Sequence, residues 1–130
     1  YWLGGKAMKY RVTLTAIGDF ALQLLQTRGS MIIFDKDVPY AYANMVVSHT
    51  RAEVKQDIAP GDTVILADRE YRVTGVGEEA NKNLREHGHC TLSFGEERTV
   101  EQPGEIVLAG DRTPRVMVGD IIEIFKDAEV

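Results

Sequence analysis

The stretch Thr63-Val64-Ile65-Leu66-Ala67-Asp68-Arg69-Glu70-Tyr71-Arg72-Val73-Thr74-Gly75-Val76 decides the fold class. Both of its arms contain β-branched residues, and three polar residues separate them. β-branched side chains fit a pleated strand, and polar residues between two such runs are typical of a turn. The stretch therefore predicts a β-hairpin with strands over residues 63–67 and 71–76.

Short strand-like segments continue on both sides of this hairpin. Residues 10–16 alternate apolar and polar side chains, which predicts a strand with one buried face. Further strands are expected over residues 31–34, 44–48, 89–94, 105–109 and 121–125. The chain is therefore expected to contain seven or eight short strands.

Helical signals are few. Residues 78–86 form the one convincing helix, with Gly88 just past its end. Residues 20–26 have helical composition, enough for a short turn or two before Gly29. Many short strands with one short helix predict an all-β fold. We expect a small closed or nearly closed barrel, because closure removes free sheet edges.

The composition is that of a single globular domain. The chain has 130 residues, 44% of them hydrophobic, a formal net charge of −5 and a pI near 5.2. The acidic balance disfavours nucleic acid as a partner, because phosphate binding needs clustered Lys and Arg. No apolar run approaches the roughly 20 residues that span a bilayer, so we expect no direct membrane insertion.

Cysteine usage and the first residues complete this outline. Cys90 is the only cysteine, so it forms no internal disulfide, and a reducing, cytoplasmic compartment is expected. Free cysteine of this kind is typically a small core residue. Residues 1–7 fit no predicted element and Met8 fits a natural start. We interpret residues 1–7 as a leader and residues 8–130 as one domain.

Three histidines, His49, His87 and His89, carry most of the candidate chemistry. An imidazole changes its charge state near neutral pH, acts as a nucleophile and binds metals. His49 follows an apolar run, so it is expected at a strand end with one ring nitrogen exposed. Held at the other nitrogen, such a ring could accept a phosphoryl group, with Ser48, Thr50 and backbone N–H groups as donors to its oxygens.

Other interpretations of the histidines stay open on these grounds. A lone strand-end histidine is commonly an ordinary surface residue. His87 and His89 are two residues apart and Cys90 is adjacent, which suggests a metal site. However, a closed zinc site needs four ligands and an open one three.

The segment Val73–Phe94 carries a distinctive pattern: Asn83-Leu84-Arg85-Glu86, then Gly88-His89, then Thr91-Leu92. This pattern resembles the glucitol/sorbitol-specific enzyme IIA of the bacterial phosphoenolpyruvate-dependent sugar phosphotransferase system (PTS). Supporting similarities are Thr15–Gly18, Pro60-Gly61 and Pro103-Gly104 ahead of Val107–Gly110. The resemblance covers about residues 9–125.

The resemblance implies a phosphocarrier of the PTS IIA type that needs no cofactor and no metal. The carrier protein HPr would donate a phosphoryl group to a histidine. The histidine would pass it to the IIB component during uptake of glucitol, sorbitol or a related sugar alcohol. His49, eleven positions before Pro60, takes the acceptor role by position. Arg51 stands where the family often has a second histidine, so His89 is the candidate orienting partner.

The resemblance leaves several points open. Tyr40, Tyr42 and Met45 are candidates for an apolar rim around His49, and a homodimer is compatible with the sequence. One alternative function is a metal-binding β-barrel that uses His87 and His89. The other is a non-catalytic regulatory barrel of the same fold.

Overall fold

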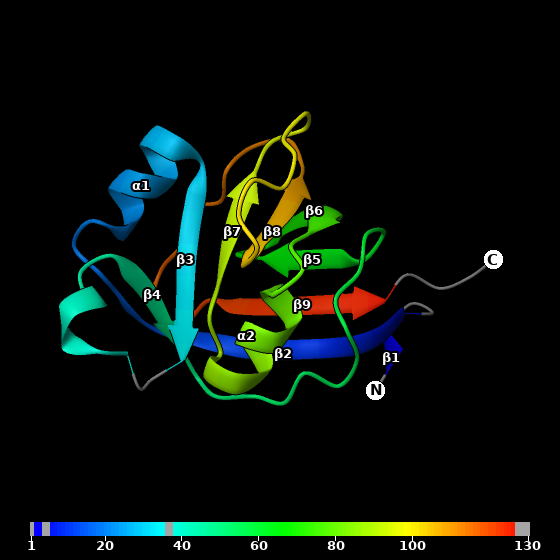
Figure 1. The fold of residues 1–130 in the computed structure, drawn as a ribbon, viewed down its shortest axis with the longest axis horizontal. Coiled ribbons are helices and arrows are strands. Elements are labelled where there is room, and N and C mark those ends of the chain that lie inside the picture. Colours follow the sequence, from blue (N-terminus) through cyan, green and yellow to red (C-terminus); the bar gives the residue numbers. More distant parts are fainter. Residues whose placement is uncertain (1, 4–5, 36–37, 127–130) are drawn as a thin grey trace.

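Strand β2 closes the sheet of this protein into a barrel. The computed structural model describes residues 2–3, 6–35 and 38–126. Its strands are β1 (Trp2–Leu3), β2 (Lys6–Ile17), β3 (Ser30–Asp35), β4 (Val46–His49), β5 (Thr63–Leu66), β6 (Arg69–Val76), β7 (Cys90–Phe94), β8 (Glu105–Ala109) and β9 (Ile121–Lys126). Eight of them form the ring β2-β4-β3-β7-β8-β6-β5-β9, which the β2–β9 pairing closes, and β1 adds to β2 (Figure 1). The predicted closed all-β barrel is confirmed.

Two register shifts accompany the pairing of β2 with two neighbouring strands, β4 and β9. Its register shifts between Met8 and Tyr10 where it pairs with β9, and between Leu14 and Ala16 where it pairs with β4. Such bulges bend a strand and increase its twist, which helps a sheet to close. Two pairings in the ring, β3–β4 and β7–β8, are parallel, and the other pairings around the barrel are antiparallel.

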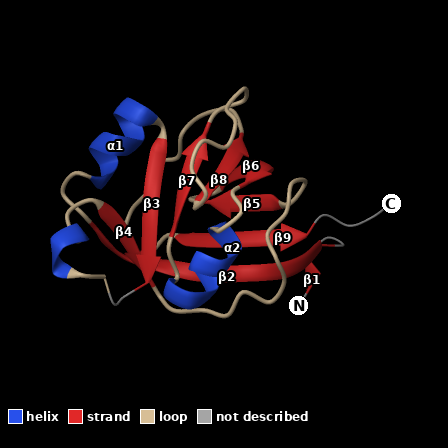
Figure 2. Cartoon of the chain, in the orientation of Figure 1, coloured by secondary structure: helices blue, strands red, loops and turns tan. Residues whose placement is uncertain are grey.

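The expectation of a single helix is wrong, because the described part of the chain contains two α-helices. These are α1 (Ala21–Arg28) and α2 (Ala80–His87), and a 3-10 turn, η1 (Tyr40–Tyr42), precedes β4 (Figure 2). Only Ala21 and Leu25 of α1 are buried, so its sequence carries little of the periodic apolar pattern that marks a helix. Gly29 and Gly88 end the two helices in the left-handed conformation, as expected.

The hairpin predicted over residues 63–76 is present, with a shorter turn than expected. β5 and β6 pair from Thr63↔Arg72 to Leu66↔Arg69. The turn is therefore Ala67-Asp68, with φ of 52° and 65°, rather than residues 68–70. Two central residues with positive φ match the right-handed twist of the paired strands. Arg69 and Glu70 consequently belong to β6.

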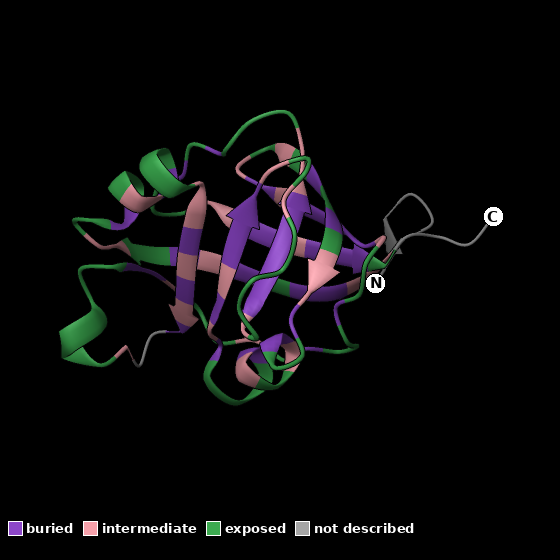
Figure 3. Ribbon diagram, turned by 45° about the horizontal axis from the view of Figure 1, so that its top comes forward, coloured by how far each residue is buried: buried purple, intermediate pink, exposed green. Residues whose placement is uncertain are grey.

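The interior of the barrel is apolar and is built from alternate residues of the strands (Figure 3). Tyr10, Val12 and Leu14 of β2 are each at most 2% exposed. Cys90 is 1% exposed, and burial raises the pKa of its thiol to about 12. The prediction that Cys90 is a core residue is confirmed, and its thiol is unreactive at neutral pH.

The leader prediction concerns residues 1–7, which the structure describes only in part. Trp2 and Leu3 pair with Ala7 and Lys6, respectively, and residues 1, 4 and 5 lie outside the described residues. The assignment of residues 1–7 as a leader and 8–130 as one domain therefore stays a prediction.

The buried carboxylate of Glu105 joins β8 to β7. The Glu105 carboxylate accepts hydrogen bonds from the Ser93 hydroxyl (2.5 Å) and from the Glu101 N–H (2.7 Å). Burial alone would raise the pKa of Glu105. The hydrogen bonds from Ser93 and the backbone, with the nearby charge of Arg98, outweigh burial and lower it. The ionised form is thus the one that the fold stabilises.

We expect Ser93→Ala to lower the free energy of unfolding by roughly 1.5–3 kcal/mol at neutral pH, because the carboxylate loses a donor. The folded-state pKa of Glu105 is depressed, so this stabilisation is present above the unfolded-state pKa and is lost as pH falls through the folded-state value. We therefore expect the difference in the free energy of unfolding between wild type and Ser93→Ala, measured by urea titration at a series of pH values, to become smaller in acid. A difference that stays constant with pH would exclude this role.

Candidate functional site

His49 is the last residue of β4 and its side chain points into the barrel. It is 0% exposed, so the expectation of an exposed ring nitrogen at a strand end is wrong for this structure. Val47 and His49 are on the inward face of β4, since side chains alternate along a strand. In the sheet His49 pairs with Leu14 of β2 and with Asp35 of β3.

Both ring nitrogens of His49 contact backbone carbonyl oxygens. Nδ1 lies 2.7 Å from the oxygen of Thr50, and Nε2 lies 2.7 Å from the oxygen of Gly88. A neutral imidazole has one N–H and can donate to only one of them, whereas a protonated ring donates to both. The backbone therefore fixes the plane and orientation of the ring.

Gly88 brings the end of α2 close to the imidazole. It has φ of +62°, and a Cβ at this position would lie 2.8 Å from the Asp35 Cβ and 3.3 Å from the His49 Cε1. A larger residue would be strained and would also clash with Asp35. Glycine at this helix end thus allows its carbonyl to reach the ring of His49.

Two residues that contact the His49 ring, Tyr10 and Gly88, line a small cavity of about 160 Å³, although His49 itself is not among its lining residues. We call it the cavity beside His49. It is lined by Tyr10, Asp35, Arg51, Ala52, Leu84, Arg85, Glu86 and Gly88. The Arg51 guanidinium pairs with the buried carboxylate of Asp35 at 3.4 Å, and Arg85 pairs with Asp57. The guanidinium groups of Arg51 and Arg85 therefore line the cavity together with the acidic residues Asp35 and Glu86, whereas Asp57 lies outside its lining.

The segment that follows β4 is held against α2. The side chain of Asn81 accepts a hydrogen bond from the Ile58 N–H (2.8 Å) and donates one to its carbonyl oxygen (3.0 Å). The Lys9 ammonium group donates to the Asp57 carbonyl oxygen and to the Asp62 carboxylate. These contacts fix residues 57–62, which continue from the cavity wall formed by Arg51.

The two predicted phosphoryl-oxygen donors are placed differently. Ser48 precedes His49 on β4, so its side chain points to the opposite face of the sheet. The Thr50 hydroxyl oxygen accepts a hydrogen bond from the Thr13 N–H at 3.0 Å, and its own carbonyl contacts His49. The structure does not bring the Ser48 hydroxyl together with the His49 ring.

His89, the expected orienting partner, faces away from the contacts of His49. Its ring stacks on Phe34 with centroids 5.2 Å apart, and its buried Nδ1 has no hydrogen-bond partner among the described residues. Burial, followed by the charge of His87, lowers the pKa of His89. In this structure the carbonyls of Gly88 and Thr50 contact the two ring nitrogens of His49, and an orienting role of His89 stays a prediction.

The metal alternative finds no support. His87 is exposed and lies 3.9 Å from the Glu86 carboxylate, and its ring centroid is 6.4 Å from that of His89. Among residues 2–3, 6–35 and 38–126, no group of three or more His, Cys, Asp or Glu side chains could hold a metal ion.

The expected apolar rim lies at the wrong end of β4. Tyr40, Tyr42 and Met45 are all exposed, as a rim requires. However, they precede β4, whereas His49 ends it. The cavity beside His49 is instead bordered by charged residues and by Tyr10.

Sequence reasoning missed several residues of this site. Arg85 and Gly88 belong to the pattern that carries the family resemblance, so that pattern could have indicated them. Tyr10 and Asp35 lie on β2 and β3, respectively, and nothing in the neighbouring sequence distinguishes them from ordinary strand residues. Their proximity to His49 depends on barrel closure, which no local signal reports.

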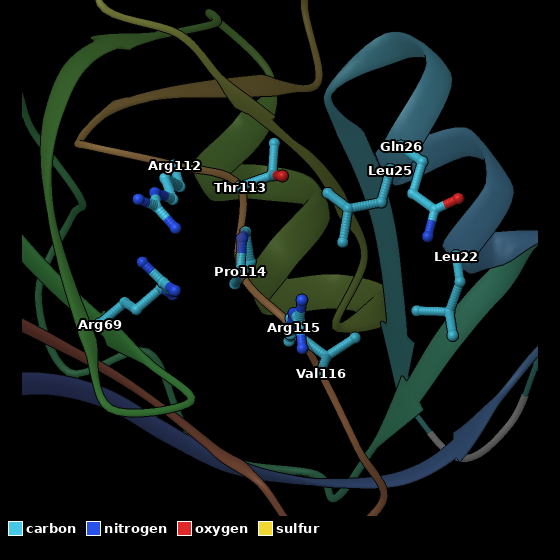
Figure 4. Close-up of a pocket in the computed structure, with 9 residues that line it drawn as sticks. All are labelled: Leu22, Leu25, Gln26, Arg69, Arg112, Thr113, Pro114, Arg115 and Val116. Carbon is cyan, nitrogen blue, oxygen red and sulfur yellow. The ribbon is translucent and has the colours of Figure 1, made fainter.

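A second cavity of about 540 Å³ lies on another part of the barrel (Figure 4). It is lined by Leu22, Leu25, Gln26, Arg69, Arg112, Thr113, Pro114, Arg115 and Val116. In Figure 4 the Arg69 and Arg112 side chains point toward one another, across from the leucines of α1. This second cavity contains no histidine and shares no described lining residue with the cavity beside His49.

The fold identifies the class of protein. The structure is similar to the crystal structure of a PTS system IIA component from Enterococcus faecalis V583, with a TM-score of 0.79 and 26% sequence identity. The similarity covers 87% of this chain and 97% of the other. The barrel is therefore that of a PTS IIA component.

The sequence comparisons identify the particular family. Residues 9–123 match the family described as PTS system glucitol/sorbitol-specific IIA component, and the chain belongs to this family. Proteins of that name from Escherichia coli K12 and Shigella flexneri are each 32% identical over 114 residues, which cover 88% of this chain and 92% of theirs.

Family membership confirms the resemblance inferred from residues 73–94. The protein is a phosphocarrier component of a sugar phosphotransferase system, and neither the metal-binding nor the regulatory alternative is supported. Within the described residues, no helix is both long and apolar enough to span a membrane.

Proposed function

We propose that this protein accepts a phosphoryl group on His49 from phospho-HPr in the cytoplasm. It then passes the group to the IIB component during uptake of glucitol, sorbitol or a related sugar alcohol. The observation that carries this proposal is a single imidazole held at both nitrogens beside a cavity with two guanidinium groups. Imidazole is a good nucleophile and leaving group near neutral pH, as a reversible carrier requires.

We assign the phosphoryl group to Nε2 of His49. The partner of Nδ1 is the carbonyl of Thr50, the next residue in the chain, so this contact can persist when neighbouring elements move. The partner of Nε2 is the carbonyl of Gly88, at the end of α2. A small displacement of the α2–β7 junction would free the Nε2 lone pair while Nδ1–H still donates to Thr50. HPr docking would supply this displacement.

Arg51 and Arg85 are the groups that would stabilise the transferred charge. The three equatorial oxygens of the phosphoryl group carry the negative charge during transfer, and guanidinium groups match their geometry. In the resting protein these arginines pair with Asp35 and Asp57. A phosphoryl group on His49 would share them with the carboxylates. Ser48 and Thr50 remain weaker candidates for the same role.

The test of the proposed function is phosphorylation in a reconstituted system. The protein is incubated with phosphoenolpyruvate, enzyme I and HPr, and a parallel reaction omits HPr. We expect one phosphate per chain, stable in base and labile in acid, and only when HPr is present. Absence of phosphate from the complete reaction would contradict the proposal.

A further inference from the structure

Tyr10 carries a buried hydroxyl group that has no hydrogen-bond partner within the described part of the chain. The residue is 2% exposed, and its phenolic oxygen has no partner among the described residues. Leaving a buried hydroxyl unpaired costs free energy, and native proteins contain few such groups. An unpaired donor of this kind is available to a ligand that reaches it in another state of the protein.

The surroundings of Tyr10 indicate which ligand this is. Tyr10 lines the 160 Å³ cavity together with Arg51, Arg85 and Gly88. Its ring meets the His49 ring edge-on, with centroids 6.3 Å apart and planes at 86°. Tyr10 is thus one of the residues that line the cavity that we propose receives the phosphoryl group, and its ring contacts the acceptor imidazole.

The hydroxyl can act only as a hydrogen-bond donor or acceptor, and not as a base. Burial raises the pKa of Tyr10 well above its usual range, and the charges of Cys90 and Asp35 raise it further. Tyr10 therefore keeps its proton at neutral pH. Donation of a hydrogen bond to a negatively charged oxygen is its strongest available interaction.

We propose that the Tyr10 hydroxyl donates a hydrogen bond to an oxygen of the phosphoryl group carried by His49. This proposal rests on the proposed function. In the transfer, the P–N bond to the donor histidine breaks and its electron pair returns to that nitrogen. The Nε2 lone pair of His49 forms the new P–N bond. The phosphoryl group keeps its three oxygens, and Tyr10 keeps its proton throughout.

Tyr71 provides a matched control on the other side of the barrel. It is also 2% exposed, but its hydroxyl donates to the Arg112 carbonyl oxygen at 2.6 Å. Tyr71→Phe should therefore lower the midpoint of thermal unfolding and leave phosphorylation by HPr unchanged. Tyr10→Phe removes an unpaired hydroxyl, so it should leave the midpoint unchanged or raise it.

The experiment compares both variants with wild type in single-turnover transfer from phospho-HPr. We expect Tyr10→Phe to slow phosphorylation by roughly 10- to 100-fold, as loss of one donor to transition-state charge does elsewhere. In wild-type protein labelled at the tyrosine ring carbons, the Cζ signal of Tyr10 should shift on phosphorylation, and that of Tyr71 should not.

The outcomes separate this inference from the function on which it rests. If wild-type protein accepts phosphate and Tyr10→Phe accepts it at the wild-type rate, the role of Tyr10 is wrong and the proposed function stands. If wild-type protein accepts no phosphate, the proposed function itself fails. If Tyr10→Phe is slow only because it is unfolded, its thermal midpoint will be lowered. Independently of this variant, an unshifted Tyr10 Cζ signal in phosphorylated wild-type protein would refute the inference.

Discussion

Replacing His49 with glutamine is expected to reduce phosphorylation by HPr by roughly three orders of magnitude or more, because the variant lacks the nucleophile. Glutamine fills a similar volume and can still donate to the carbonyl of Gly88 or Thr50. The barrel should therefore remain folded, which circular dichroism and the thermal midpoint can verify. The measurement is single-turnover phosphate incorporation.

His87→Gln is the matched control for this substitution. It makes the same chemical change at an exposed residue of α2, so phosphorylation should match wild type. His89→Gln tests the orienting role expected from the sequence. Because the carbonyls of Gly88 and Thr50 hold the His49 ring, we expect a smaller effect than at His49. If the His49→Gln variant incorporates as much phosphate as the wild-type protein, the phosphorylation site is elsewhere.

Replacing Lys9 with methionine is expected to cause the largest loss of stability, roughly 3–5 kcal/mol. The Lys9 ammonium and the Asp62 carboxylate lie 2.7 Å apart, with side chains only 4% and 6% exposed. Removing the lysine leaves a buried carboxylate that still accepts a hydrogen bond from the Ala59 N–H but has lost its cation. The measurement is the free energy of unfolding from urea titration.

The neighbouring pair Arg11–Glu123 is the control for Lys9. Its atoms are 3.4 Å apart, but the side chains are 51% and 21% exposed. Solvent screens such a pair, so Arg11→Met should cost less than about 1 kcal/mol. Equal costs for the two substitutions would mean that burial of the Lys9–Asp62 pair has no special effect. The double variant Lys9→Met/Asp62→Leu should recover part of the loss, because it removes the unpaired charge.

The sequence predicts the strands and helices of this fold better than it predicts the closure of the sheet into a barrel. β8 lies over the predicted residues 105–109, and most other strands differ by a few residues, because period-two alternation and turn residues are local signals. The β2–β9 pairing joins residues more than a hundred positions apart, and no local signal specifies it. The apolar positions of residues 20–26 predict only a turn or two, and in the structure α1 buries just two of its side chains.

The site could be predicted only in part, for a similar reason. The family resemblance predicts His49 as the acceptor by its position, and its motif contains Arg85 and Gly88. The burial of His49 depends on the carbonyl of Gly88, which approaches from an element thirty-nine residues away. Tyr10 and Asp35 complete the cavity from two further strands. A strand-end histidine in isolation appears as a surface residue, and tertiary packing makes it a buried one.

The location of the phosphate on wild-type protein tests the central claim most directly. The protein is labelled with ¹⁵N in its histidine rings, phosphorylated through HPr and examined by NMR for coupling between ³¹P and ring nitrogens. We expect coupling to Nε2 of His49, with Nδ1 still protonated. Coupling to a nitrogen of His87 or His89, or phosphate on a residue other than histidine, would contradict it.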